Sequence, residues 1–140
     1  MTSKPSKLQL QLRSQTCCVE PVCLQITDLL QQHGLAGHLF AVELVARELL
    51  NNAILHGNNL SPDTRVGFCM TIGRRWICLQ VTDEGEGYDW RRIRRELPDP
   101  DATCGRGINI ARLYAQKLTF GDDGRRIEAR FDRRVVSTPC

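Results

Sequence analysis

The stretch ELLNNAILHG, residues 48–57, is the part of the sequence that most directly indicates the fold. From residue 36 to residue 56 apolar side chains recur mostly at spacings of three and four, which predicts one long helix. Glu48 and Asn52 are four residues apart and therefore share a face of that helix. A carboxylate suits general-base chemistry, and a carboxamide oxygen suits a hard cation beside phosphates. The alternative is a solvated polar stripe, because glutamate is usually exposed.

A second stretch, VTDEGEGY at residues 81–88, follows a strand predicted over residues 76–82. Asp83 stands at the end of that strand, where a carboxylate can accept a hydrogen bond from an exocyclic amino group such as that of adenine. Gly85 and Gly87 allow a sharp turn and let a flat ligand approach without a Cβ in the way. The alternative is an ordinary acid-glycine turn.

The third stretch is Gly105-Arg106-Gly107-Ile108, at the start of a helix predicted over residues 107–118. Glycine-rich backbone at a helix N-terminus presents unpaired N–H groups and the positive end of the helix dipole to an anion. Arg106 adds a charge-assisted donor for a terminal phosphate. The alternative is a flexible hinge with a solvated arginine.

The remaining pattern predicts an α/β two-layer sandwich of the α+β kind, with a mixed, mostly antiparallel sheet and helices on one face. One domain is expected over residues 8–134, between a flexible N-terminus at residues 1–7 and a flexible tail at residues 135–140. Residues 88–104 have no sustained period and are predicted to form a long functional loop. The other predicted elements are a helix over residues 21–33 and strands over residues 8–12, 66–72, 119–121 and 127–131.

Composition narrows the class of protein. The chain has 140 residues and a net charge of +3, which gives no electrostatic case for direct nucleic acid binding. No apolar run approaches the roughly 20 residues of a membrane span, and the start lacks the apolar core of a signal peptide, so a cytoplasmic protein without a membrane partner is expected. The seven cysteines are odd in number and lack zinc-ligand spacing, so buried or incidental thiols are expected.

The order of the three stretches resembles the Bergerat ATP-binding superfamily of gyrases, histidine kinases and related ATPases. Its motifs are an Asn-bearing helix, a DxGxG box and a GxG lid, and the resemblance covers about residues 8–133. Within that superfamily the sequence is similar to the bacterial anti-sigma-factor serine/threonine kinases. This narrower likeness rests on the residues of two motifs. They are Glu48, Asn52-Ala53 and His56-Gly57 in the first, and Gly105-Arg106-Gly107-Ile108 in the second.

The resemblance implies a role for each matching residue. Glu48 would be the catalytic base, and Asn52 would hold the Mg²⁺ that bridges to the triphosphate of ATP. Asp83 would bind the adenine amino group, and residues 88–104 would form a mobile lid. The other ATP-binding positions would be Gly85 and Gly87 at the pocket floor, Tyr88 beside the base, and Gly105, Arg106, Gly107 and Ile108 around the phosphates.

The implied function is transfer of the γ-phosphoryl group of Mg-ATP to an anti-anti-sigma partner with a STAS domain. A sigma factor is a further expected partner, and relatives commonly form homodimers. The competing hypothesis is a nucleotide-gated binding protein that sequesters or activates a partner without phosphotransfer. The catalytic half of a histidine kinase is disfavoured, because no helical hairpin with a phosphoacceptor histidine precedes the domain.

Two departures from the family pattern stand out. Gly124-Arg125-Arg126 occupies the place where related ATPases often have Gly-Thr, so a hydroxyl that orders the adenine site is missing. The DxGxG box carries Glu84 and Glu86, which near phosphates are tolerable only if they point away. His56 is assigned to helix packing and capping. The arginine cluster at residues 91–95 is a solvated loop face, a partner-binding patch or a reservoir of charge in the ATP lid.

Overall fold

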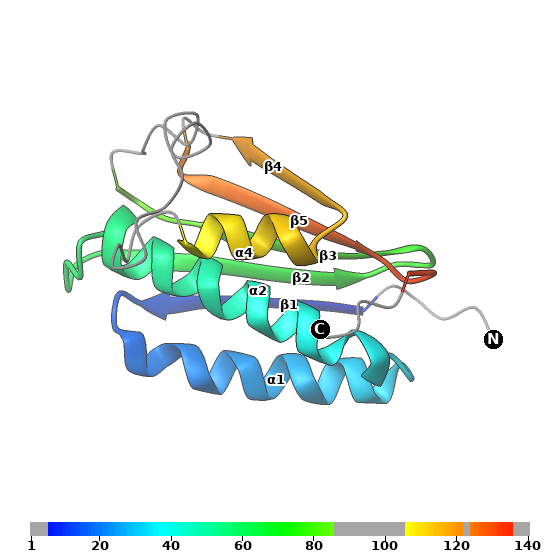
Figure 1. Cartoon of the computed structure of the whole chain (residues 1–140). Helices are drawn as coiled ribbons and strands as arrows, with labels where there is room; N and C mark the ends of the chain where they lie inside the picture. The colour runs from blue at the N-terminus through cyan, green and yellow to red at the C-terminus, as the bar shows by residue number, and fades with distance from the viewer. Residues whose placement is uncertain (1–5, 86–105, 122–123, 136–140) are drawn as a thin grey trace.

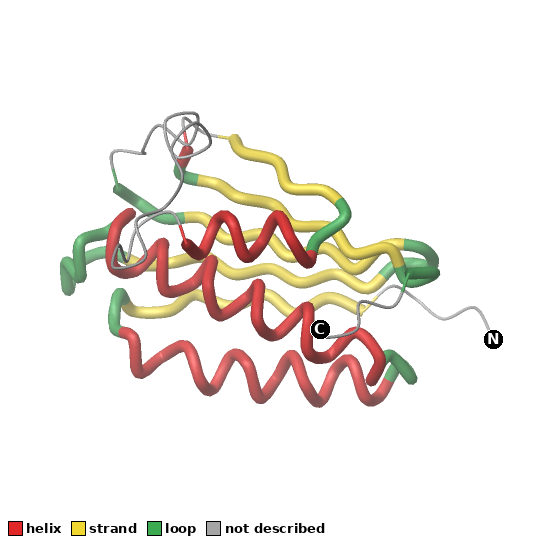
Figure 2. The backbone as a smooth tube through the Cα atoms, in the orientation of Figure 1, coloured by secondary structure: helices red, strands yellow, loops and turns green. Residues whose placement is uncertain are grey.

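The computed structural model describes residues 6–85, 106–121 and 124–135, which form two layers (Figures 1 and 2). One layer is a five-stranded sheet with the strand order β1-β2-β3-β5-β4, and the helices cover one of its faces. The main elements are β1 (Ser6–Arg13), α1 (Val19–Gln32), α2 (Leu39–Asn52), β2 (Arg65–Ile72), β3 (Trp76–Thr82), α4 (Arg106–Tyr114), β4 (Lys117–Gly121) and β5 (Arg126–Asp132). Short helical turns lie at Thr16–Cys18 (η1), Ala36–His38 (η2) and Ala53–Gly57 (η3).

The two-layer α+β sandwich expected from the sequence is confirmed. Every described strand pairing is antiparallel, which refines the expectation of a mixed sheet. β2 and β3 are joined by a tight turn, β4 and β5 form a second hairpin, and β5 returns to lie beside β3. Both hairpins reverse the chain direction, and all four pairs among the described strands are antiparallel.

The core lies between the sheet and the helices. Along β2 and β3 buried and partly exposed residues alternate strictly, because successive strand side chains point to opposite faces. α2 is the central helix, lies between α1 and α4 (Figure 1), and buries the side chains of six residues. These are Ala41, Val42, Val45, Ala46, Leu49 and Leu50.

Several element boundaries differ from those expected. β1 begins at Ser6, so two residues of the expected flexible N-terminus belong to the sheet. α4 ends at Tyr114 instead of residue 118, because Leu118 pairs with Ala129 in the β4–β5 hairpin. Its apolar side chain fits a helical or a strand period, and the cross-strand pairing decides between them. The predicted loop at residues 88–104 and the tail beyond residue 135 lie outside the described residues.

Candidate functional site

The end of α2 carries the first pair of candidate residues. Glu48 and Asn52 are half-buried, stand one helical turn apart, and Asn52 is the last residue of α2. The chain then continues as the π-helical turn η3, in which the Asn58 N–H donates to the Ala53 carbonyl at 2.8 Å. π turns are rare and occur often at functional sites, since they change the direction of the side chains that follow. The long helix expected to residue 56 is therefore α-helical only to Asn52.

Asp83 lies directly after β3 and is buried, with 5% of its surface exposed. Gly57, at the end of η3, packs against it: a Cβ at Gly57 would lie closer than 3.0 Å to the Asp83 carboxylate. A Cβ at Gly85 would collide with the carbonyl group of Gly57. The helix end and the strand end are thus in direct contact through two glycines.

This contact gives a second reason for a glycine at position 85. The missing Cβ leaves space for the backbone of Gly57, so packing within the protein by itself requires glycine there. The role of Gly85 beside a flat ligand stays a prediction.

Backbone contacts hold Asp83 in place. Its N–H donates to the Arg125 carbonyl at 2.9 Å, and its Oδ1 accepts the Gly85 N–H at 2.8 Å. Burial raises the pKa of Asp83, while the Gly85 hydrogen bond and the positive charge of Arg125 act in the opposite direction. Arg125 is the residue that replaces the expected threonine, so this departure from the family pattern lies beside Asp83.

Asn58 is a site residue that the sequence interpretation missed. It is 4% exposed, and its Oδ1 accepts the Glu84 N–H at 2.8 Å. Its Nδ2 donates to the Ser14 Oγ and to the Arg65 carbonyl, both at 3.0 Å. One carboxamide therefore ties the segment after Asp83 to the end of β1 and to the start of β2. The sequence signal was only an asparagine after a helix-ending glycine, which also fits an ordinary helix stop.

The structure describes Glu84, one of the two extra acids of the DxGxG box. The Glu84 carboxylate accepts the backbone N–H of Arg65, which leads into β2, and the Glu84 side chain is exposed. It is thus engaged with the start of the neighbouring strand. Glu86 lies outside the described residues.

The candidate residues gather at one end of the molecule. Asn52 precedes Gly57 by five residues, or about 8 Å along a helix axis, and Gly57 contacts Asp83. Figure 1 shows the end of α2, the end of β3 and the start of α4 on the same side. α4 begins at Arg106, which places the backbone of Arg106, Gly107 and Ile108 at its first turn. The side chains of those three residues, and Gly87, Tyr88 and Gly105 altogether, lie outside what the structure describes.

Asn52 is a candidate ligand for a magnesium ion that is shared with phosphates. Within residues 6–85, 106–121 and 124–135, no three His, Cys, Asp or Glu side chains are grouped as metal ligands. Mg²⁺ in phosphate-transfer sites usually keeps waters and takes one or two protein oxygens. Asn52 can supply one such oxygen without adding negative charge. His56, assigned to helix packing, lies half-buried in η3.

None of the described helices is long and apolar enough to cross a membrane.

Comparisons with known proteins identify the family. A comparison with curated proteins gave no significant match. Residues 13–131 match the model of the histidine kinase-like ATPase domain, and this match confirms the resemblance to Bergerat-type ATPases. Because it takes in all of α1 through β4 and nearly all of β5, the chain belongs to the histidine kinase-like ATPase domain family.

Proposed function

We propose that this domain is a serine/threonine protein kinase of the anti-sigma-factor type, which phosphorylates a small STAS-type anti-anti-sigma partner. An ATPase domain of this family implies ATP binding, usually with Mg²⁺. The observation that supports the finer proposal is the position of Glu48. It stands one turn before Asn52 on the helix whose continuation packs against Asp83.

Glu48 would accept the proton of the partner's Ser or Thr hydroxyl. The hydroxyl oxygen then forms a bond to the γ-phosphorus, and the bond from that phosphorus to the β-phosphate oxygen breaks, with ADP as the leaving group. Such a base is expected to contribute about 10²- to 10⁴-fold in rate. A pure binding protein has no need of a base in this position.

The other residues would position the nucleotide. Asp83, fixed by Gly85 and the Arg125 carbonyl, would accept the adenine amino group. Asn52 would hold the Mg²⁺ that neutralises the phosphates. The first N–H groups of α4 have no partners within the helix and would donate to the phosphates, with Arg106 beside them. Each role needed for phosphoryl transfer therefore has a candidate in this chain.

The test compares Glu48→Gln with the unmodified protein. Transfer of radiolabelled phosphate from ATP to purified STAS domains is followed in time, and ATP binding is measured by calorimetry. We expect transfer to fall by about 10²- to 10⁴-fold while ATP binding survives, because Asn52 and Asp83 are untouched. Glu43→Gln is the matched control: this half-buried glutamate lies on the same helix, where it is paired with Arg47 at 3.2 Å.

The outcomes separate the two candidate functions. Equal transfer rates for Glu48→Gln and the unmodified protein would remove Glu48 as the base. ATP binding without transfer by the unmodified protein, across several STAS domains, would instead favour the nucleotide-gated binding protein. That protein would sequester a sigma factor or another partner and would lose nothing in the Glu48→Gln variant.

A further inference from the structure

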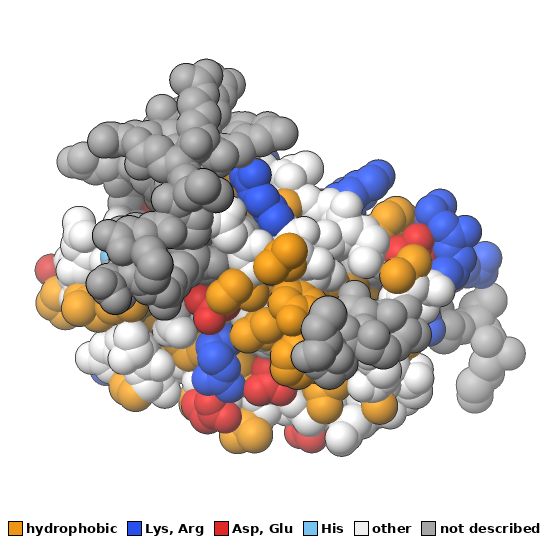
Figure 3. All heavy atoms as spheres, viewed as in Figure 1, with side chains coloured by type: hydrophobic (Ala, Val, Ile, Leu, Met, Phe, Trp, Pro, Cys, Tyr) orange, Lys and Arg blue, Asp and Glu red, His pale blue; other side chains and the backbone are white. Residues whose placement is uncertain are grey.

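The end of the sheet away from the candidate site carries a group of cations, which we call the basic end. It comprises Arg74 and Arg75 in the β2–β3 turn, Lys117 at the start of β4, and Arg133 and Arg134 directly after β5. Figure 3 shows Lys and Arg side chains gathered over the β2–β3 turn and the end of β5. Trp76 and Asp132 lie among these cations and pair in the β3–β5 register.

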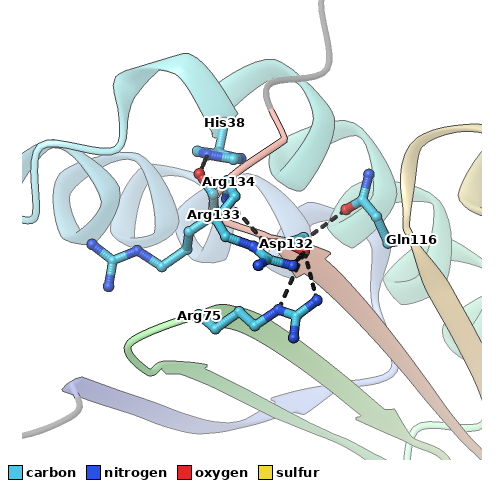
Figure 4. A network of polar contacts seen from close by, with 6 residues as sticks. All are labelled: His38, Arg75, Gln116, Asp132, Arg133 and Arg134. Atoms are coloured by element: carbon cyan, nitrogen blue, oxygen red, sulfur yellow. Dashed lines mark hydrogen bonds and ion pairs between the residues drawn. The ribbon is translucent and has the colours of Figure 1, made fainter.

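Asp132 holds two arginines of the basic end, Arg75 and Arg134 (Figure 4). It is 5% exposed and accepts from both Nε and Nη2 of Arg75 at 3.3 Å. Arg134 donates to the same carboxylate from its backbone N–H at 3.0 Å, from Nε at 3.1 Å and from Nη2 at 3.0 Å. These hydrogen bonds from Arg134 hold the pKa of Asp132 well below its usual range. The carboxylate is therefore ionised at neutral pH and holds two guanidinium groups in fixed positions.

One carboxylate does not neutralise two guanidinium groups. The side chains of Arg75 and Arg134 are 52% and 65% exposed, and each guanidinium has five N–H donors of which Asp132 takes two. The remaining donors can reach a carboxylate from outside in the forked geometry that arginine favours. The basic end thus holds arginines that are ordered before any ligand arrives, which lowers the entropic cost of binding.

Trp76 brings one further cation, Lys117, to the place that Arg75 already occupies. The Arg75 guanidinium carbon lies 4.9 Å from the Trp76 ring centroid, and the Lys117 Nζ lies 5.1 Å from it. One aromatic ring therefore holds cations from the β2–β3 turn and from β4 close together. Arg133 fastens the neighbouring backbone, since its Nη1 donates to the Gly73 carbonyl at 2.6 Å and its N–H to the Arg75 carbonyl at 2.7 Å.

The basic end has a clear excess of cations over acids. The chain has 19 Lys and Arg against 16 Asp and Glu, and the basic end takes five of the former and one of the latter. The remainder of the chain then carries a slight negative charge. Elsewhere on the outer face of the sheet Arg130 is paired with Glu128 at 2.7 Å, so that arginine is offset by a neighbouring acid.

We infer that the basic end is a docking surface for an acidic segment of a protein partner, read through its Asp and Glu carboxylates. Paired arginines match carboxylates, and a patch confined to one sheet end suits a short peptide segment. A nucleic acid backbone or a membrane surface usually requires a longer or broader basic track. Trp76 and Asp83 bracket β3, about 23 Å apart, so such a partner would dock away from the nucleotide.

The test uses the full chain and a fluorescently labelled deca-glutamate peptide, with binding followed by fluorescence anisotropy. We expect salt-sensitive binding that weakens at least about tenfold when Arg74→Glu and Lys117→Glu are combined. Asp132 keeps both of its guanidinium partners in this variant, so thermal unfolding should stay close to that of the unmodified protein. For a matched single charge reversal, Arg74→Glu is compared with Arg13→Glu, an exposed arginine at the other end of the sheet.

The inference is supported if peptide binding falls in Arg74→Glu and in the double variant but stays within about twofold in Arg13→Glu. It is overturned if no peptide binding is detected or if Arg74→Glu and Arg13→Glu weaken it equally. Tighter binding of single-stranded DNA or of phosphatidylglycerol vesicles than of the peptide would also overturn it and would assign the surface to that other class. None of these outcomes depends on phosphotransfer, so the proposed kinase activity stands or falls separately.

Discussion

At the residue scale, the buried carboxylate of Asp83 suits ligand binding but lowers the stability of the ligand-free protein. Burial raises its pKa, so the folded protein holds the charged form less readily than the unfolded chain does. Its contribution to stability is therefore greatest below the ordinary pKa of 3.8 and is lost as the pH rises through the higher folded pKa. A ligand that donates a hydrogen bond to the carboxylate would restore the lost stability. It is typical of a ligand-binding group that it lowers the stability of the ligand-free domain.

Asp83→Asn should raise the stability of the nucleotide-free protein and lower its affinity for ATP. The carboxamide oxygen can still accept the Gly85 N–H, but no charge is buried, so the nucleotide-free variant should melt at a higher temperature than the unmodified protein at pH 7. This difference should vanish below about pH 3.8, where the unmodified carboxyl is protonated in both states. ATP affinity should fall by about 10- to 100-fold, with weaker discrimination against GTP. Thermal melts across pH and calorimetric titrations measure both effects, and an unchanged ATP affinity would contradict the adenine-binding role.

The two glycines beside Asp83 lead to a prediction about packing. Gly85→Ala places a Cβ on the Gly57 carbonyl, so the contact between helix end and strand end must open, at a cost of about 1–3 kcal/mol. Gly67→Ala is the control, because a Cβ there would sit 3.8 Å from the Thr82 Cβ, an ordinary contact. Urea unfolding of the two variants should show a loss for Gly85→Ala and little change or a gain for Gly67→Ala. Equal losses would mean that the contact is less tight than described.

At the element scale, the connection between α2 and β3 depends on η3 and Asn58. η3 brings Gly57 onto Asp83, and Asn58 then joins the segment after β3 to Ser14 and Arg65. Three parts of the chain, at Ser14, at residues 58–65 and at Glu84, thus meet at one buried carboxamide. Because buried polar networks are costly when only partly satisfied, this connection should respond as a unit to a change in Asn58.

Asn58→Asp tests that connection with little change in shape. The aspartate can still accept the Glu84 N–H, but it has no donor for the Arg65 carbonyl, which would then face a buried carboxylate. We expect a loss of about 1–3 kcal/mol in unfolding free energy and a weaker ATP affinity, because the segment that carries Asp83 is no longer tied down. Asn59→Asp, at the exposed neighbouring position, should change neither quantity measurably. Full stability in Asn58→Asp would show that the network is not needed.

At the scale of the whole molecule, the two ends of the sheet have opposite electrostatic character. Asp83 at the site end is a buried acid with a raised pKa, and Asp132 at the basic end is a buried acid with a lowered pKa. The difference arises because backbone hydrogen bonding and one nearby arginine do not offset burial at Asp83, whereas Arg134 and Arg75 supply charged donors to Asp132.

The two acids should therefore respond to pH with opposite signs. Stability contributed by Asp132 is fully present above the ordinary pKa of 3.8 and is lost as the pH falls through the lower folded pKa. Asp132→Asn should lower the melting temperature at pH 7, and the difference from the unmodified protein should shrink as the pH falls below about 3.8. Asp83→Asn should show the opposite sign in the same melts. A pH-independent effect of Asp132→Asn would contradict the ion-pair description.

Much of the fold follows from local periodicity. The alternation in β2 and β3 and the spacing of three and four in α2 are properties of short segments, so they can be recognised without knowing the neighbours. For the same reason Glu48 and Asn52 could be placed on one helix face. The order of the three motifs then indicated the family, which the match over residues 13–131 confirms.

Only the tertiary structure decided how these segments meet. It showed that Gly85 is required by the Gly57 backbone, that Asn58 holds the segment after β3, and that Leu118 belongs to β4 and not to the preceding helix. It also brought Arg75 to Asp132 and Lys117 to Trp76. The physical reason is that each of these features is a contact between residues distant in the chain, and such contacts are set by strand pairing and helix packing, which no local period records.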